Sequence, residues 1–205
     1  MTLHSLPLFP LGTVFYPGGQ LPLRIFEVRY LDMVNKCLSS GAPFGVVSLT
    51  EGIEVQRPNA DEAFSSVGTL ALINQHASPQ AGLKVVVCAG GQRFRIMRRE
   101  RLKHGLWIAD VEHIEDDHIV AIPEELSLAP QALQKAQVQL LASGSIDSEH
   151  PLVKNPQFDA CGWVANRWCE LLPLRAELKQ QLLELDSPII RLELVHDILE
   201  KYKII

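Results

Sequence analysis

The sequence predicts an α+β fold, in which a mainly-β N-terminal half forms a small barrel or sandwich and a helical bundle follows it. Short apolar runs separated by turn residues fill about the first 120 of the 205 residues, a pattern typical of strands. Beyond them, apolar residues recur every three or four positions, as in amphipathic helices. A stretch with two prolines, AIPEELSLAP, separates the two patterns. We therefore predict a β-rich subdomain at residues 1–120 and a helical subdomain at residues 121–205.

The N-terminal segment LPLFPLGTVFYPGGQLPLRIFEVRYLDMV, residues 6–34, begins with two apolar strands on either side of the turn Pro17-Gly18-Gly19. Its prolines at positions 7, 10 and 22 lack a backbone donor and suit strand edges or irregular crossings. This composition favours a wound, partly closed β structure over a flat central sheet. A helix is expected from Arg29 to about Ser39, where one apolar stripe contains Tyr30, Met33, Val34 and Cys37.

Further strands are expected in four apolar runs: Phe44–Leu49, Val67–Gln75, Leu83–Ala89 and Leu106–Ile114. The polar stretch Glu51–Ser66 is typical of a loop. Gly90-Gly91 predicts a bulge or a sharp bend, because glycine adopts φ values that other residues avoid.

The helical half begins with a predicted linker at Ala121–Pro130, followed by a helix at Gln131–Ala142. Two later helices are expected to begin with a capping residue and a proline, at Asn155-Pro156 and at Ser187-Pro188. Pro173 ends or kinks the first of these, and a helix at Ala176–Leu185 lies between them. In the last helix we expect a core stripe of Ile190, Leu194, Ile198 and Tyr202, broadened by Leu192, Val195 and Leu199.

Four segments of the chain resemble the Lon-type N-terminal domain, the substrate-binding module at the front of the Lon ATP-dependent proteases. LPLFPL, PGG and LPLRIFEVRYLDM resemble the opening of that domain, VGTLALI at residues 67–73 its Gly-centred strand, and GQRFRI at residues 91–96 its G-x-R-F-R-I segment. LLPLRAELKQQLLELDSPIIRLELVHDIL resembles the helical part that follows. The resemblance covers nearly the whole chain. It implies a PUA-like pseudo-barrel for the N-terminal half, and similar modules occur as free-standing proteins and within cereblon.

The resemblance implies a free-standing, non-catalytic module that binds unfolded or flexible polypeptide segments, with a separate ATPase or protease as a possible collaborator. The chain contains no phosphate-binding G-x-x-x-x-G-K-[ST] motif and no G-x-S-x-G nucleophile elbow. Nothing in it matches the serine-lysine peptidase domain of a Lon protease. We therefore expect no enzymatic activity, no catalytic residue and no cofactor.

Cysteine, histidine and apolar patterns give no support to a metal site or a membrane segment. The four cysteines form no C-x-x-C pair and suit buried thiols in a reducing cytoplasm. His104, His113 and His118 lie among acidic residues without ligand-like spacing and are better explained as a solvated strand end. The N-terminus lacks the features of a secretory signal, and no run reaches the ~20 apolar residues of a membrane span.

The first group of residues considered for partner binding is Arg24, Phe26, Glu27, Arg29 and Tyr30. Glu27 lies where a strand meets a helix, so a helix cap or an ion pair with Arg24 or Arg29 accounts for these charges. The alternative is that the group borders a groove that meets an unfolded chain.

The second group is Arg93, Phe94 and Arg95, at the start of a basic run that reaches Lys103. Strand alternation predicts Phe94 on a core face and both arginines on a solvated face. An RNA-associated PUA-like module using the Arg93–Lys103 strand is the alternative function. The net charge of −5 and the interrupting Glu100 argue against nucleic acid.

Overall fold

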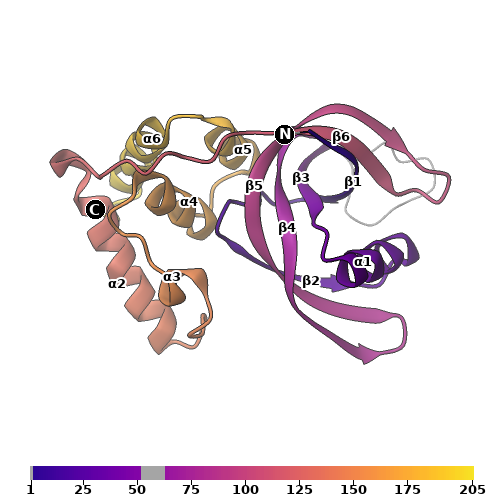
Figure 1. Ribbon diagram of the computed structural model, residues 1–205. Helices are drawn as coiled ribbons and strands as arrows, with labels where there is room; N and C mark the ends of the chain where they lie inside the picture. The colour runs from indigo at the N-terminus through magenta and orange to yellow at the C-terminus, as the bar shows by residue number, and fades with distance from the viewer. Residues whose placement is uncertain (1, 52–62) are drawn as a thin grey trace. The chain divides into compact units, whose positions relative to one another are not determined.

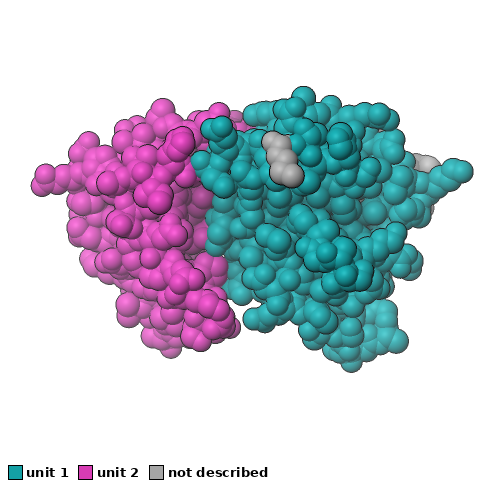
Figure 2. Space-filling model, viewed as in Figure 1, with its two compact units in different colours: residues 1–116 teal, residues 117–205 magenta. Residues whose placement is uncertain are grey.

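The computed structural model describes residues 2–51 and 63–205 (Figure 1). The chain divides into two compact units, unit 1 at residues 1–116 and unit 2 at residues 117–205 (Figure 2). Most of the predicted loop between residues 51 and 66 lies outside the described residues. Its last four residues, 63–66, belong to a strand instead.

Unit 1 is built on a six-stranded mixed sheet that closes on itself. The sheet order is β2-β5-β4-β3-β1-β6, and β6 also pairs with β5, so that β5, β4, β3, β1 and β6 form a ring. Among the described strands only β1 and β3 pair in parallel, and α1 (Val28–Ser40) lies between them in sequence together with β2. The strands are β1 (Thr2–Leu11), β2 (Gln20–Ile25), β3 (Phe44–Glu51), β4 (Ala63–Gln80), β5 (Leu83–Arg101) and β6 (Trp107–His113). This sheet and the helices after it confirm the predicted α+β class.

The described residues of unit 1 contain two apolar clusters. The larger one joins α1 to the sheet through Tyr30, Met33 and Val34, all at most 3% exposed. The smaller one surrounds Phe94, which is fully buried. A Cβ atom on either Gly45 or Gly68 would lie 2.7 Å from the tip of the Phe94 ring, so both glycines make room for this side chain.

The connection from β1 to β2 runs close against β5. The Gly18 N–H donates to the Gly90 carbonyl at 2.8 Å, and the Gly90 N–H donates to the Gly19 carbonyl at 2.9 Å. A Cβ atom at position 90 would lie 2.1 Å from the Tyr16 carbonyl oxygen, which only glycine avoids. The β4–β5 pairing shifts register between Thr69 and Ala71, opposite this point, and confirms the predicted irregularity at Gly90-Gly91.

Unit 2 is helical, with α4 packed against α6 (Figure 1). Trp168 of α4 is buried and donates its indole N–H to the Ala129 carbonyl at 3.0 Å, which ties α4 to the start of α2. The elements are η1 (Glu124–Leu126), α2 (Leu128–Ala142), α3 (Pro151–Lys154), α4 (Cys161–Leu171), α5 (Ala176–Glu184) and α6 (Pro188–Lys201).

A buried arginine organises the centre of unit 2. Arg191 is 1% exposed, and its guanidinium contacts both carboxylate oxygens of Asp117. The same group donates to the Asn166 side chain at 3.1 Å and to the Leu182 carbonyl at 3.0 Å. A guanidinium saturated in this way anchors the first residue of the unit to α4, α5 and α6.

Two helix predictions were wrong. The predicted linker contains η1 and the start of α2, whose first turn accommodates Pro130 because the first N–H groups of a helix need no partner within it. Asn155-Pro156 starts no helix. Two helices do begin with a capping residue followed by a proline. One is α3, where the His150 side chain accepts the Leu152 N–H, and the other is α6, where Ser187 is the predicted cap.

The core face of α6 also differs from the prediction. Leu192, Val195 and Leu199 are fully buried, whereas three of the four residues of the predicted stripe, Ile190, Leu194 and Tyr202, are exposed. The helix has two adjacent apolar faces, and packing against α4 buries the face with Leu192, Val195 and Leu199. Across the described parts of the chain, none of the helices is long and apolar enough to cross a membrane.

Candidate functional site

Unit 1 contains a cleft of about 650 Å³ with a mainly apolar lining. One wall is a side of α1, the other is the turn between β5 and β6, and β1 also contributes residues to the lining. We call it the α1 cleft. It is lined by Ser5, Pro7, Val28, Arg29, Asp32, Met33, Lys36, Cys37, Ser40, Ala42, Pro43, Leu102, His104, Leu106 and Ile108. Its size and its mainly apolar surface are typical of sites that bind a small molecule or a short segment.

The α1 wall follows from the amphipathic pattern of the helix. Tyr30, Met33, Val34 and Cys37 fall on the face that packs into the larger core cluster. Val28 at the first helical position is left 72% exposed at the mouth of the cleft. Covering such an exposed apolar side chain with a partner is favourable, because it removes apolar surface from water.

Arg29 holds the two walls of the cleft together. Although it is charged, its side chain is only 4% exposed. Its Nε donates to a Glu27 carboxylate oxygen at 3.0 Å, and its Nη1 donates to the Gly105 carbonyl at 2.8 Å. Gly105 has a φ of 88°, which closes the tight turn of the opposite wall. The guanidinium therefore fixes that turn to the start of α1.

The chemical groups in the α1 cleft suit binding better than catalysis. Cys37 is the only thiol among the lining residues, and its burial raises the pKa of the thiol. A thiol kept protonated at neutral pH is a poor nucleophile. Asp32, Lys36 and His104 supply mixed charge around an apolar interior, an arrangement that can orient a bound segment.

The first group of sequence-predicted site residues separates in the structure. Arg29 lines the cleft and Glu27 pairs with it. Tyr30 is 3% exposed and stacks on Phe9 with ring centroids 4.2 Å apart, so it supports the cleft from the core. Arg24 on β2 is exposed, as is Phe26, at 56%. Neither lines the cleft.

The second group gives a correction. Phe94 lies on the core face as predicted and Arg95 is exposed, but the prediction that Arg93 is solvated was wrong, because it is 3% exposed. Arg93 faces Thr69 across the β4–β5 pair, and the Thr69 hydroxyl donates to the Phe15 carbonyl at 2.6 Å. The β1–β2 connection thus meets this face of the sheet at Thr69, and the Arg93 Nη2 donates to the Glu115 carbonyl at 3.5 Å. Strand alternation alone reveals neither contact.

The basic strand beyond Arg93 is exposed but interleaved with carboxylates and aromatic rings. Arg98 lies 3.5 Å from Glu100, and Arg95 pairs across the sheet with Glu112. Arg99 lies over the Phe64 ring, 4.4 Å from its centroid. These local contacts account for the arginines without a nucleic acid.

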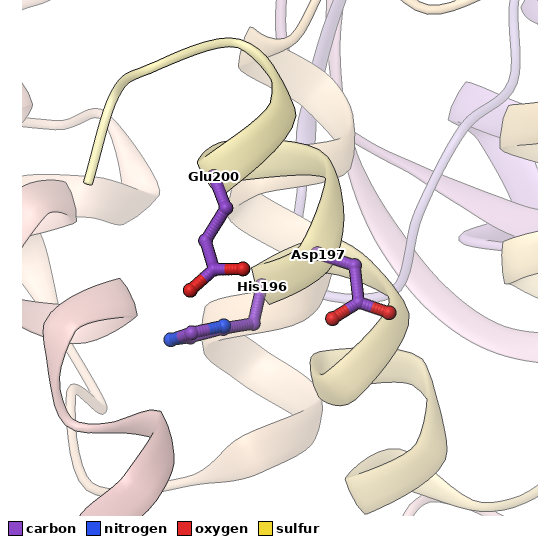
Figure 3. A group of neighbouring side chains, drawn as sticks. All are labelled: His196, Asp197 and Glu200. Carbon is purple, nitrogen blue, oxygen red and sulfur yellow. The ribbon is translucent and has the colours of Figure 1, made fainter.

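A possible metal-ligand group within the described residues lies on α6 of unit 2. Ligand atoms of His196, Asp197 and Glu200 all lie within 4.8 Å of one another. In Figure 3 Glu200 reaches over the imidazole, whereas the Asp197 carboxylate is directed to the other side of His196. The histidines considered in the sequence do not form such a group: the His113 Nδ1 instead contacts the Gln92 amide oxygen.

The model of the ATP-dependent protease La (LON) substrate-binding domain matches residues 5–201 of the chain. The chain belongs to this family. The match confirms the resemblance found in the sequence. Like the members it matches, the chain combines a mixed sheet with helices, and its α1 cleft lies in the sheet-bearing unit.

Two curated relatives of this Lon-family chain are named Lon protease. The one from Anaeromyxobacter dehalogenans is 25% identical over 96% of the chain, and the one from Paraburkholderia phytofirmans is 27% identical over 91%. In both cases the match spans 23% of the relative's own length. The region that the chain shares with these proteases is therefore a minor part of each.

Two solved Lon N-terminal structures resemble the chain along nearly its whole length. A Lon N-terminal domain protein from Xanthomonas campestris is 32% identical, with a TM-score of 0.74 over 94% of this chain and 97% of the other. The N-terminal domain of Lon protease from the Mycobacterium avium complex is 18% identical, with a TM-score of 0.60 over 94% and 96%, which shows a shared fold.

Proposed function

We propose that this chain is a non-catalytic polypeptide-binding module, and that its α1 cleft receives an apolar side chain from an unfolded or flexible segment of a client protein. The observation that carries the proposal is a mainly apolar cleft of about 650 Å³ in a chain that matches a substrate-binding family. The exposed Val28 at its mouth and the buried Cys37 thiol support binding without chemistry. We include a cytoplasmic location in the proposal, because all four cysteines are buried free thiols.

The cleft favours a short apolar anchor. A bound segment would place one large apolar side chain between α1 and the β5–β6 turn, near Met33 and Leu106, while Asp32 and Lys36 meet its polar flanks. Burying one such side chain contributes about 1.5–3 kcal/mol, so the affinity of a single segment is modest. Modest affinity suits a module that samples many clients, and cleavage of those clients is left to another domain or another protein.

The test uses fluorescently labelled extended peptides that carry one central Leu-Phe pair, and matched peptides with serine in its place. We expect the apolar peptide to bind the chain and the serine peptide to bind at least about tenfold more weakly, since roughly 1.4 kcal/mol corresponds to a factor of ten. Val28→Asp, which places a charge at the mouth of the cleft, should weaken binding of the apolar peptide by a similar factor. Leu72→Asp is the matched control, because Leu72 is an exposed apolar residue on β4 outside the cleft.

Equal binding by the wild type and Val28→Asp would show that the peptide binds elsewhere.

A salt titration separates this function from the RNA alternative. Apolar peptide binding should change little between low and moderate salt, whereas phosphate contacts weaken steeply.

A further inference from the structure

The C-terminal helix α6 carries an apolar stripe that the core of unit 2 does not use. Ile190, Leu194 and Tyr202 are 47%, 42% and 51% exposed, and Ile198 between them is half-buried. Residues four apart are neighbours on a helix surface, so Ile190, Leu194 and Ile198 form a slanting ridge along α6, and Tyr202, the residue that follows the helix, extends it. The helix meets the core through a different face, as Leu192, Val195 and Leu199 show.

A row of carboxylates runs beside this stripe. Glu193, Asp197 and Glu200 are all exposed, and their spacing of four and three residues aligns them along the helix. Figure 3 shows the Asp197 and Glu200 side chains projecting from α6, and a carboxylate oxygen of one lies within 4.8 Å of a carboxylate oxygen of the other. Like charges at this spacing repel each other, and a cationic partner relieves that repulsion. The stripe and the acidic row together form the solvent side of α6.

We propose that this side of α6 is a docking surface for an amphipathic helix of a partner protein, with an apolar stripe and a flank of Lys or Arg. A ridge of residues four apart packs into the grooves of another helix, and helix-on-helix docking of this kind is a common recognition mode. Basic residues on the partner's flank lie against the carboxylate row and set its orientation. The surface is in unit 2, so the proposal is independent of the α1 cleft.

Charge distinguishes this partner from two other occupants. A second copy of this chain brings the same three carboxylates to the contact, and the exposed cations that follow them in the sequence, Lys201 and Lys203, are fewer. An anionic lipid surface is repelled by the same row. A basic helix is the occupant that satisfies both the stripe and the charges.

The test measures binding of three synthetic helices of about 21 residues, six turns, to the full chain by fluorescence anisotropy. The first has leucines along one stripe and lysines along one flank. The second has glutamate in place of every lysine, and the third has glutamine in place of every leucine. We expect the first to bind, and the other two to bind at least about tenfold more weakly.

Two variants of the chain locate the contact. Ile190→Ser with Leu194→Ser removes the stripe, and Glu193→Gln with Asp197→Asn removes two charges of the row. Each should weaken binding of the lysine helix roughly threefold to tenfold. The matched control is Val138→Ser with Leu141→Ser on α2, which removes two exposed apolar residues elsewhere in unit 2 and should bind as the wild type does.

Equal binding of the lysine and glutamate helices overturns the proposal, as does a loss of binding in the α2 control as large as in the stripe variant. Sedimentation of the chain alone gives a further test. If the wild type forms a dimer and the stripe variant does not, a second copy occupies the surface and the proposal of a basic partner helix is wrong. If the stripe variant fails to fold, the charge variant decides, because its two substituted side chains are exposed and isosteric with the originals.

Discussion

Replacing Arg29 by alanine should destabilise unit 1 and loosen the α1 cleft at the same time. The side chain is 4% exposed and joins Glu27, at the start of α1, to Gly105 in the opposite wall. Its removal leaves the Glu27 carboxylate and the Gly105 carbonyl without this donor. The turn that forms one wall then loses its tie to the helix.

The size of the effect follows from the burial of the pair. Removing one partner of a buried ion pair costs about 3–5 kcal/mol, mainly because the other charge stays in place without compensation. The Glu27 side chain is 20% exposed, so water reaches it and reduces that cost. We expect the free energy of unfolding to fall by about 2–4 kcal/mol. Arg29→Lys should lose about half as much, since a single ammonium group does not reproduce the fork that reaches both partners.

Urea unfolding of the wild type and the variants measures the change in the free energy of unfolding. Hydrogen exchange of the Gly105 amide, which donates to the Leu102 carbonyl at 2.8 Å, reports on the turn itself. We expect faster exchange there in Arg29→Ala under conditions where the chain remains folded. Arg24→Ala, at an exposed position on β2, is the control and should stay within about 0.5 kcal/mol of the wild type.

A loss below about 1 kcal/mol in Arg29→Ala would refute the view that this pair organises the cleft. A double-mutant cycle with Glu27→Ala sharpens the test, because a coupling energy near zero would show that the two side chains act independently.

Three further predictions concern stability. Burial raises the pKa of Glu170 to about 7, so the folded chain holds a proton that the unfolded chain releases near pH 4.5. The contribution of Glu170 to the free energy of unfolding should therefore fall as the pH rises from about 4.5 to 7, by up to about 3 kcal/mol, and the melting temperature of the wild type should fall more between pH 5 and pH 8 than that of Glu170→Gln. Gly90→Ala should cost at least about 2 kcal/mol in urea unfolding, because its Cβ atom would lie 2.1 Å from the Tyr16 carbonyl oxygen. Asp117→Ala should cost about 3–5 kcal/mol, because it leaves the guanidinium of Arg191 buried without its carboxylate.

Each of these predictions has a neighbouring control. Glu170→Gln should flatten the part of the pH dependence between pH 5 and pH 8 that Glu170 contributes, and an unchanged slope would assign it to other groups. Gly91→Ala should cost less than Gly90→Ala, since its Cβ atom would meet only the Leu72 side chain, at 3.2 Å, and slightly more distant atoms of Leu70. Asp116→Ala, at an exposed position next to Asp117, should be nearly neutral, and equal losses at 116 and 117 would contradict the role given to the Asp117 carboxylate as the partner of Arg191.

Local signals in the sequence were sufficient for much of unit 1. The apolar spacing from Tyr30 to Cys37 predicted α1 and the face it buries, and Gly90-Gly91 marked the irregularity in β5. These features depend on residues close together in the chain. Arg29 was also singled out among the charged residues near the start of α1, although its partner Gly105 lies far along the chain.

The errors have a common physical cause, which is that long-range packing decides what covers a surface. Strand alternation placed Arg93 outside the core. It could not show that the β1–β2 connection bonds to the neighbouring Thr69, or that the segment after β6 contacts the Arg93 guanidinium. In α6 two adjacent faces are apolar, and only the packing of α4 selects the one with Leu192, Val195 and Leu199. The α1 cleft likewise exists only because the β5–β6 turn meets α1, so its outline had no local signature in the sequence.

The pairing of β1 with β6 has a consequence for how the protein is made. Thr2 lies opposite Glu112, so the two ends of unit 1 are adjacent strands in the finished ring. During synthesis β1 leaves the ribosome before the other strands of unit 1, and β6 follows only after nearly all of the unit has been made. Closure of the ring is therefore a late event with an entropic cost, and a nascent chain stalled before β6 leaves backbone N–H and C=O groups on one edge of β1 unpaired.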